Sequence, residues 1–240
     1  MAALEARHLS ELTFPEVTRA LRALSSSYVE RRRKLARGTA LSGAGKRAAF
    51  ALFYGPLHYL LVRHVVHVLP NASNGAPALI DLGCGTGAAG AAWAAACTTL
   101  PRVTGIDRNR WALEEAARTY RQFDLRSRVH QADLVAAKLP PGRVMILAAF
   151  ALNELSDQSR DVFLRRLLDR VEQGHRALIV EPLAGTVAPW WPRWRETFQA
   201  IGGRADEWKF PAELPSIVTK LDRAAGLDHR EITGRTLWSG

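Results

Sequence analysis

The sequence predicts an α/β fold in which a mostly parallel sheet, covered by helices on both faces, follows a helical N-terminal extension. Two patterns lead to this prediction. A short apolar run at 78–82 ends in a glycine-rich turn, and an Ala-rich helical segment follows the turn. From there to residue 200, apolar strand-like runs alternate with segments of helical periodicity.

The predicted elements follow one another along the chain. Strands are expected at 78–82, 102–106, 127–131, 144–149 and 176–181, and helices at about 87–98, 110–122, 157–172 and 187–200. The tail predicts one more helix at 216–225, ended by Gly226, and two short strands near 229–232 and 235–238. The sheet would then have seven strands.

Residues 1–75 are predicted to form the basic helical extension, and residues 76–240 the sheet domain. The turn-rich segment 70–75 marks the expected boundary. Within the extension, residues 12–30 have the spacing of an amphipathic helix.

Residues 50–69 are apolar enough to raise the question of a membrane span. The segment also contains Arg63 and three histidines, which are costly in a bilayer. We therefore expect a buried helix, broken near Pro56, and no membrane association.

The positive charge is concentrated in the extension. The chain carries a formal net charge of +10, and residues 1–75 hold 11 Arg and Lys against 4 Glu, or +7 of that total. Such a field favours polyanions, of which nucleic acid is the commonest in cells. The residues expected to contact phosphates are Arg31, Arg32, Arg33, Lys34, Lys46 and Arg47. The alternative is a solvated helix end with cations near its C-terminus.

The two cysteines, Cys84 and Cys97, fit no zinc motif, and a disulfide between them is not expected. No metal site is predicted. The first 14 residues contain Glu5 and Glu11 and no long apolar block, unlike a signal peptide. Cytoplasmic localisation is expected.

The glycine-rich turn allows two cofactors. Residues 85–90 satisfy the G-x-G-x-x-G pattern, and Asp107 follows about 20 residues later, so a dinucleotide is formally possible. However, Asp81 would then sit in a strand that dinucleotide-binding proteins keep apolar, and Gly83 would have no role.

The fuller string Asp81, Gly83, Gly85 and Gly87 resembles motif I of the class I S-adenosylmethionine-dependent methyltransferases. The resemblance implies a Rossmann-like, seven-stranded methyltransferase sheet with S-adenosylmethionine as cofactor. It further implies that the acid of the loop meets the cofactor's ammonium, that Asp107 accepts the ribose hydroxyls and that Asp133 meets the adenine amino group. Taken alone, Asp107 is also a plausible helix N-cap and Asp133 a plausible turn residue. The full set expected to bind the cofactor is Asp81, Gly83, Cys84, Gly85, Gly87, Asp107, Arg108, Ala132, Asp133, Leu134 and Ala149.

A closer resemblance covers roughly residues 50 to 185. The segments 151–155, 165–168 and 175–185 look like the mitochondrial small-ribosomal-subunit methyltransferase-like family, which also has bacterial relatives. This resemblance implies an association with ribosomal RNA or the small ribosomal subunit. Members commonly carry an iron–sulfur cysteine cluster after the fifth strand. Residues 186–194 contain no cysteine, so no metal cluster is expected.

The residues expected to face the methyl acceptor follow the fourth and fifth strands. Asn153 and Glu154 are the candidate catalytic residues, and Glu154 is the first choice as a base, ahead of His58. Trp190, Trp191 and Trp194 could stack an extruded base, or could instead pack onto the sheet.

The sequence thus predicts an S-adenosylmethionine-dependent methyltransferase acting on ribosomal RNA or on a small-subunit assembly intermediate. Two alternatives stay open. One is a small-molecule methyltransferase with a closed pocket beneath the extension. The other is a ribosome assembly factor that binds the cofactor and transfers nothing.

Overall fold

A seven-stranded sheet forms the centre of the protein. The computed structural model describes residues 1–30, 41–140, 142–183 and 188–240. The strand order is β3-β2-β1-β4-β5-β7-β6. The strands are β1 (Ala78–Leu82), β2 (Arg102–Asp107), β3 (Ser127–Gln131), β4 (Met145–Ala149), β5 (Arg176–Glu181), β6 (Arg204–Pro211) and β7 (Glu231–Ser239). Strands β1 to β5 are parallel, and β7 runs antiparallel to both β5 and β6.

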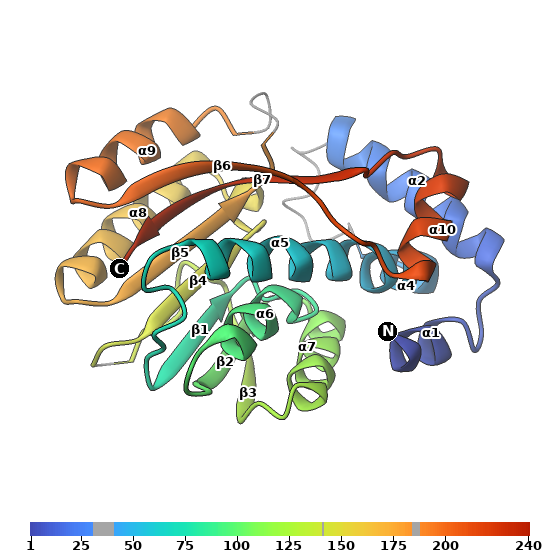
Figure 1. Ribbon diagram of the computed structural model, residues 1–240, viewed down its shortest axis with the longest axis horizontal. Helices are drawn as coiled ribbons and strands as arrows, with labels where there is room; N and C mark the ends of the chain where they lie inside the picture. The colour runs from blue at the N-terminus through green and yellow to red at the C-terminus, as the bar shows by residue number, and fades with distance from the viewer. Residues whose placement is uncertain (31–40, 141, 184–187) are drawn as a thin grey trace.

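Alternate residues of the central strands point to opposite faces, as the pleat of a sheet requires. In β4, Met145 and Leu147 join a hydrophobic cluster with α5 (Gly55–Val68), α6 (Ala88–Ala96) and α7 (Arg110–Gln122). Ile146 and Ala148 join the second cluster, with α8 (Asp157–Glu172) and α9 (Trp191–Ala200). The sheet therefore lies between two helical layers (Figure 1).

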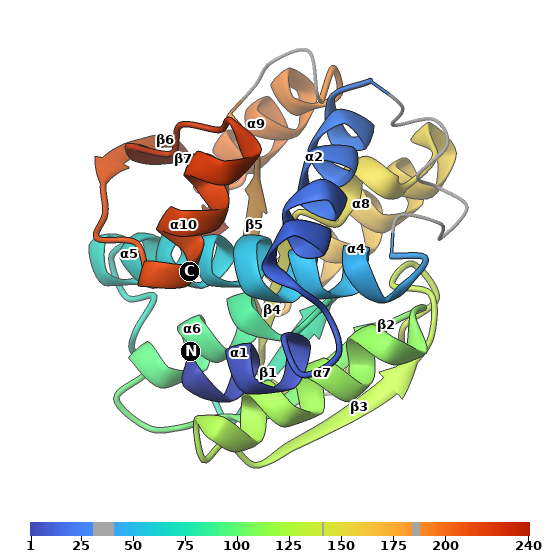
Figure 2. The ribbon, with the colours of Figure 1, turned by 90° about the vertical axis from the view of Figure 1, so that its right-hand side faces the viewer.

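The other helices gather at one end of the molecule, on the right in Figure 1 and facing the viewer in Figure 2. They are α1 (Ala2–His8), α2 (Phe14–Glu30), α4 (Ala44–Ala49) and α10 (Ser216–Ala225). A single π turn, η1 (Phe50–Tyr54), joins α4 to α5.

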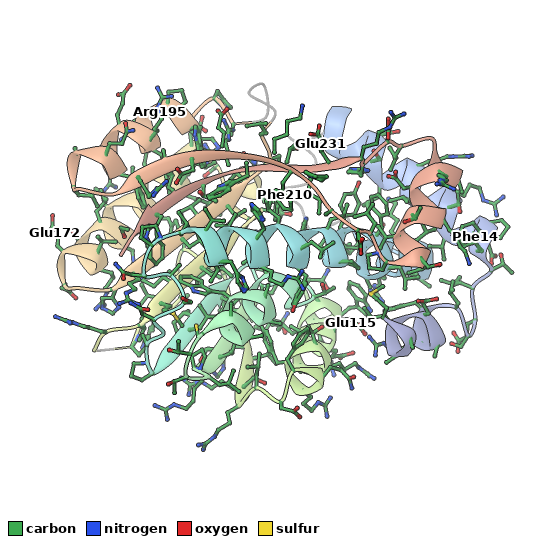
Figure 3. The ribbon with its side chains drawn as sticks, viewed as in Figure 1. Phe14, Glu115, Glu172, Arg195, Phe210 and Glu231 are labelled. Carbon is green, nitrogen blue, oxygen red and sulfur yellow. The ribbon has the colours of Figure 1, made fainter. Side chains whose placement is uncertain are left out.

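The helical extension and the sheet share one core. Val17 and Leu21 of α2 and Val65 of α5 are buried in the same hydrophobic cluster as Leu79 of β1. The domain boundary near residue 75 stays a prediction, but the described part of residues 1–75 packs on the sheet domain rather than around a core of its own. Glu115 of α7 anchors α1, because it contacts both Arg7 and His8 (Figure 3).

The strands predicted at 78–82, 102–106, 127–131, 144–149 and 176–181 are confirmed to within one residue, and the total of seven strands is right. The prediction of two short strands in the tail is wrong, because β7 is one continuous strand. The sequence predicted two strands here because Gly234 interrupts the strand-like pattern. A Cβ at Gly234 would lie 2.5 Å from Leu61 Cδ2, so the glycine lets α5 pack against the strand.

Strand β6 was missed. Half of its residues are charged and only Trp208 is buried, as is typical of an exposed edge strand. Its sequence therefore has no clear alternation of apolar and polar residues.

The predicted break near Pro56 is a change of helix type rather than a gap. The π turn η1 ends at Tyr54, two residues before Pro56, and the chain continues directly into α5. The helix predicted at 187–200 begins at Trp191. Within the described ranges, no helix is long and apolar enough to cross a membrane.

Candidate active site

The glycine-rich loop lies between β1 and the N-terminus of α6. The backbone N–H groups of Gly83 and Cys84 both donate to the carbonyl oxygen of Ile106 in β2, which fixes the loop to the neighbouring strand. Gly83 has φ +66°, and a Cβ there would lie 2.5 Å from that of Ala151. Only glycine fits this position, because any side chain would be strained and would collide with the turn after β4.

A cavity of about 790 Å³ opens at the carboxyl ends of β1, β2 and β4. The extension covers it with residues from α2, η1 and α5, including Ser25, Phe50, Tyr54 and His58. A volume of this size is in the upper part of the ~300–1,000 Å³ range of small-ligand pockets. Of the predicted site residues, those that line it are Asp81, Gly83, Cys84, Gly85, Asp107, Arg108, Ala132, Leu134, Ala149, Asn153 and Glu154.

Asp81, at the end of β1, is only 1% exposed. Its Oδ2 accepts a hydrogen bond of 2.8 Å from the Tyr120 hydroxyl on α7. Burial raises the pKa of Asp81 to about 7, although the Tyr120 hydrogen bond opposes that shift. A Cβ at Gly90 would lie 2.2 Å from Asp81 Oδ2, so the third glycine of the G-x-G-x-x-G pattern makes room for this carboxylate.

Asp107 is the last residue of the adjacent strand, β2. Its Oδ2 accepts a hydrogen bond of 2.9 Å from the N–H of Gly85, and its Oδ1 accepts one of 2.8 Å from the N–H of Asn109. The carboxylate therefore holds the loop and the start of α7 in place. The N-cap of α7 is Asn109, so the alternative of Asp107 as N-cap is wrong. Each carboxylate oxygen keeps a lone pair for a ligand hydroxyl.

Arg108 connects two further acids. Its guanidinium lies 3.8 Å from Asp133 Oδ2 and 3.6 Å from Glu154 Oε2. Burial, and then the charge of Asp107, raise the pKa of Glu154 to about 7, while Arg108 opposes the shift. Asp133 accepts the N–H of Val135, and neither Asp133 nor Gly87 is among the described residues that line the cavity.

Asn153 is held by two hydrogen bonds. Its Nδ2 donates to Oε2 of Glu181, and its Oδ1 accepts 3.0 Å from the indole N–H of Trp190. Glu181 is fully buried at the end of β5, and its Oε1 also accepts the backbone N–H of Leu152. Asn153 therefore fixes the turn after β4.

The predicted base-stacking role is wrong for two of the three tryptophans. Trp191 and Trp194 are 5% and 1% exposed and belong to the core beneath α9. The guanidinium of Arg235 lies over the Trp191 ring at 4.3 Å. Trp190 is half-buried and bonds Asn153. The three indoles thus pack onto the sheet, the alternative that the sequence also allowed.

The basic residues predicted to contact phosphates divide into two groups. Arg31, Arg32, Arg33 and Lys34 lie outside the described residues. Lys46 and Arg47 lie on α4, and both are half-buried. Arg47 donates to the carbonyl oxygen of Leu41 and lies 5.7 Å from the ring centroid of Trp111, so it stabilises the local fold.

Sequence reasoning missed two residues of the site: Tyr120, which bonds Asp81, and Glu181, which bonds Asn153. Glu181 had a visible signal, because it ends the apolar run of β5 in the same way that Asp81 ends β1. Tyr120 had none, since its contact with Asp81 spans 39 residues.

Metal and thiol chemistry find no support among the described side chains. No group of three or more His, Cys, Asp or Glu in the described ranges could hold a metal ion. His64 of α5 stacks on Phe210 of β6, the residue labelled in Figure 3. Burial raises the pKa of the Cys84 thiol well above its usual range, which disfavours a nucleophilic thiolate.

The volume and the acidic lining of the cavity suit S-adenosylmethionine. The cofactor is a cation with an ammonium, a sulfonium and a ribose diol. The lining supplies the carboxylates of Asp81, Asp107 and Glu154 beside a loop without side chains at Gly83 and Gly85. The first turn of α6 adds Thr86, Ala88 and Ala89 at the same place.

Comparisons with known proteins agree with this geometry. Residues 79–174 match a family model described as a methyltransferase domain. No curated protein matches the chain in sequence. The structure of mitomycin 7-O-methyltransferase MmcR has a TM-score of 0.54 at 15% identity, over 99% of this chain and 71% of that one. A Leishmania major protein described as a SAM-dependent methyltransferase has a TM-score of 0.53 at 15% identity, over 88% and 82%. The chain therefore resembles a methyltransferase domain over residues 79–174, and its seven-stranded α/β fold is similar to the folds of these two methyltransferases.

Proposed function

We propose that the protein transfers a methyl group from S-adenosylmethionine, bound between the glycine loop and the extension, to an acceptor in the same cavity. The observation that carries this proposal is the convergence of Asp81, Gly83, Gly85 and Asp107 on one cavity within a matched methyltransferase domain. When bound, the cofactor supplies an activated methyl group on a positively charged sulfur.

The residues of the chain have separate roles in this proposal. Asp81, when ionised, pairs with the cofactor's ammonium, and Asp107 accepts its ribose hydroxyls while holding Gly85. Ala132, Leu134 and Ala149 contribute small or apolar surface beside them. Holding donor and acceptor in line accounts for most of the rate, because methyl transfer depends chiefly on proximity and orientation.

Glu154 is the proposed base. The bound cofactor would supply its methyl group to the acceptor's lone pair, and the electrons of the broken carbon–sulfur bond would stay on sulfur. Glu154 would receive the proton that the acceptor loses. Its pKa of about 7 leaves a large fraction of the carboxylate ionised at neutral pH.

Ribosomal RNA or a small-subunit assembly intermediate is the proposed acceptor. Support comes from the net charge of +10, of which +7 lies in residues 1–75. It comes also from Arg108 and Arg110, which line the cavity with side chains 46% and 85% exposed.

A small aromatic molecule is the second candidate. The observation that favours it is the cover of the cavity, which includes Phe50, Tyr54, Leu57 and Leu61 from the extension. Such a lining is typical of pockets that enclose a small ligand.

The test measures transfer of radiolabelled methyl groups to small subunits, large subunits, free ribosomal RNA and a metabolite extract. Label in small subunits or their RNA, lost with Asp107→Ala, supports the first proposal. Label only in the extract replaces it with the second candidate. Cofactor binding with no transfer to any acceptor contradicts the proposed reaction and favours a non-catalytic assembly factor.

A further inference from the structure

Four rings gather on the wall of the cavity beside the glycine loop. Phe50, Tyr54 and His58 follow one another at intervals of four residues along η1 and α5, with ring centroids 5.9 to 6.2 Å apart. Phe150, just after β4, stacks on His58 at 3.9 Å with an interplanar angle of 14°. All four side chains line the cavity.

The helix that carries these rings passes directly over the glycine loop. A Cβ at Gly85 would lie 3.6 Å from the Phe50 ring, and one at Gly55 would lie 3.3 Å from Thr86 Oγ1. The backbone N–H of Gly55 donates to the carbonyl oxygen of Phe50, which makes this turn a π turn. Isolated π turns within helices occur frequently at functional sites.

Phe150 has an unusual backbone. Its φ of +58° lies in the left-handed region, which a bulky residue rarely adopts. Its N–H donates 2.8 Å to the carbonyl oxygen of Val180, so β5 holds the strained turn in place. Strain of this kind concentrates at functional sites, and here it accompanies a ring that lies flat against His58.

His58 has no hydrogen-bond or ion-pair partner among the described residues. Burial alone lowers its pKa to about 3, so its imidazole is neutral and offers one donor and one acceptor nitrogen. The His58 side chain is half-buried and lines the cavity, so a ligand bound there can reach a ring nitrogen. The other half-buried histidine on this helix, His64, stacks on Phe210 of β6 instead of facing the cavity.

We propose that the wall of Phe50, Tyr54, His58 and Phe150 is a subsite for a planar ring that carries an N–H or O–H group. The rings of Phe50, Tyr54 and Phe150 contact the ligand, and a nitrogen of His58 accepts its hydrogen bond. The subsite thereby orients the acceptor against the cofactor loop.

This inference rests on the proposed function and narrows the acceptor to a chemical class. That class has two sources, a base extruded from RNA and a free aromatic molecule. Both present a flat ring and a polar hydrogen.

The test compares matched probes in which a methyl group replaces the polar N–H or O–H hydrogen. One pair is 2-naphthol and 2-methoxynaphthalene. The other pair is a uridine hexamer and the same hexamer with N3-methyluridine. Their dissociation constants are measured with wild type, His58→Phe and His67→Phe, each saturated with S-adenosylhomocysteine. His58→Phe keeps a ring for stacking, whereas His67 is exposed and bonds the Arg63 carbonyl on the same helix, so its variant is the control.

We expect the donor form of at least one pair to bind about five- to tenfold more tightly to wild type and His67→Phe, and this preference to vanish in His58→Phe. If the naphthol pair shows the preference, the ligand of the subsite is a free aromatic molecule. If the RNA pair shows it, the ligand is an RNA base. Equal binding of both forms to wild type, or a preference that survives His58→Phe, overturns the inference. Binding of S-adenosylmethionine, measured on the same proteins without S-adenosylhomocysteine, separates the two proposals. If wild type binds S-adenosylmethionine but shows no probe preference, the cofactor proposal stands and the subsite is refuted. If wild type shows the preference but does not bind S-adenosylmethionine, the subsite stands and the cofactor proposal is refuted.

Discussion

The Tyr120 hydroxyl on α7 donates a 2.8 Å hydrogen bond to Asp81 at the end of β1, and both side chains are buried. This bond ties the helix that follows the second strand to the acid of the glycine loop. Because the bond stabilises the ionised form of Asp81, it partly offsets the burial that raises the pKa of that carboxyl to about 7.

Removing this hydrogen bond should weaken cofactor binding at neutral pH. In Tyr120→Phe the pKa of Asp81 rises further, so less of the carboxylate is ionised at pH 7 and S-adenosylmethionine should bind about three- to tenfold more weakly. Calorimetry between pH 6 and 7.5 checks this, with Tyr59→Phe as control, because Tyr59 stacks on Phe123 away from the cavity. Equal loss in both variants would contradict the assigned role of the bond.

The same carboxyl should make stability depend on pH. Its pKa is raised from 3.8 to about 7 by folding, so its contribution to stability is fully present below pH 3.8 and is lost as pH rises through about 7. Asp81→Asn cannot ionise at this position, so it lacks this loss of stability. Between pH 4.5 and 7.5 the free energy of unfolding of the variant, relative to that of wild type, should therefore rise by about 1 to 3 kcal/mol. Urea unfolding at both pH values measures the difference, and a difference independent of pH would refute the assignment.

Gly83→Ala should cost more than the same change at an open left-handed glycine. Gly83 and Gly202 both have positive φ, but a Cβ at Gly202 meets nothing within 4 Å. The left-handed backbone should lower the free energy of unfolding by about 1–2 kcal/mol in each alanine variant. The clash with Ala151 should lower it by about 1–3 kcal/mol more in Gly83→Ala. Thermal unfolding of both variants compares them. Similar losses would mean that the contact between the loop and Ala151 is loose.

Glu115→Gln should release the first helix. The Glu115 side chain is 5% exposed and contacts Arg7 and His8 of α1. Burial by itself raises the pKa of Glu115, but His8 and Arg7 more than offset that, and the net shift is downward. The variant should lose about 1–3 kcal/mol, with faster hydrogen exchange in α1. Glu114→Gln, at an exposed neighbour, is the control, and unchanged exchange in α1 would disprove the anchoring.

Glu154 should determine the pH dependence of the reaction. A base must be ionised to accept a proton, so with a pKa of about 7 the rate should rise as pH increases through 7. Glu154→Gln should lower the rate about 10²-fold and flatten the profile. Rates from pH 5.5 to 8.5 test this, and a variant that retains the wild-type profile would remove Glu154 from the mechanism.

The parts of the fold that local sequence patterns encode could be predicted. The strands that carry Asp81 and Asp107 read as apolar runs, because both faces of a parallel sheet are buried. The glycine loop was recognisable because its glycines are closely spaced in the sequence. Strand β6 was not, because an exposed edge strand is mostly polar and pairs only with a strand that follows it in the chain.

The contacts that build the site were less predictable, because they join distant residues. Nothing in the sequence places Tyr120 against Asp81, Trp190 against Asn153, or His58 against Phe150. For the tryptophans, both a stacking and a core role fitted the sequence, and burial decides for the core at Trp191 and Trp194.

Binding of S-adenosylmethionine is the most direct test of the account. Titration calorimetry should show one site per chain in wild type, and binding at least tenfold weaker in Asp107→Ala, which loses both the ribose contact and the hydrogen bond to Gly85. The matched control is Asp124→Ala, at an exposed acid after α7, which should bind as wild type does. No binding to wild type, or equal binding to Asp107→Ala, would contradict the proposal that this cavity holds the cofactor.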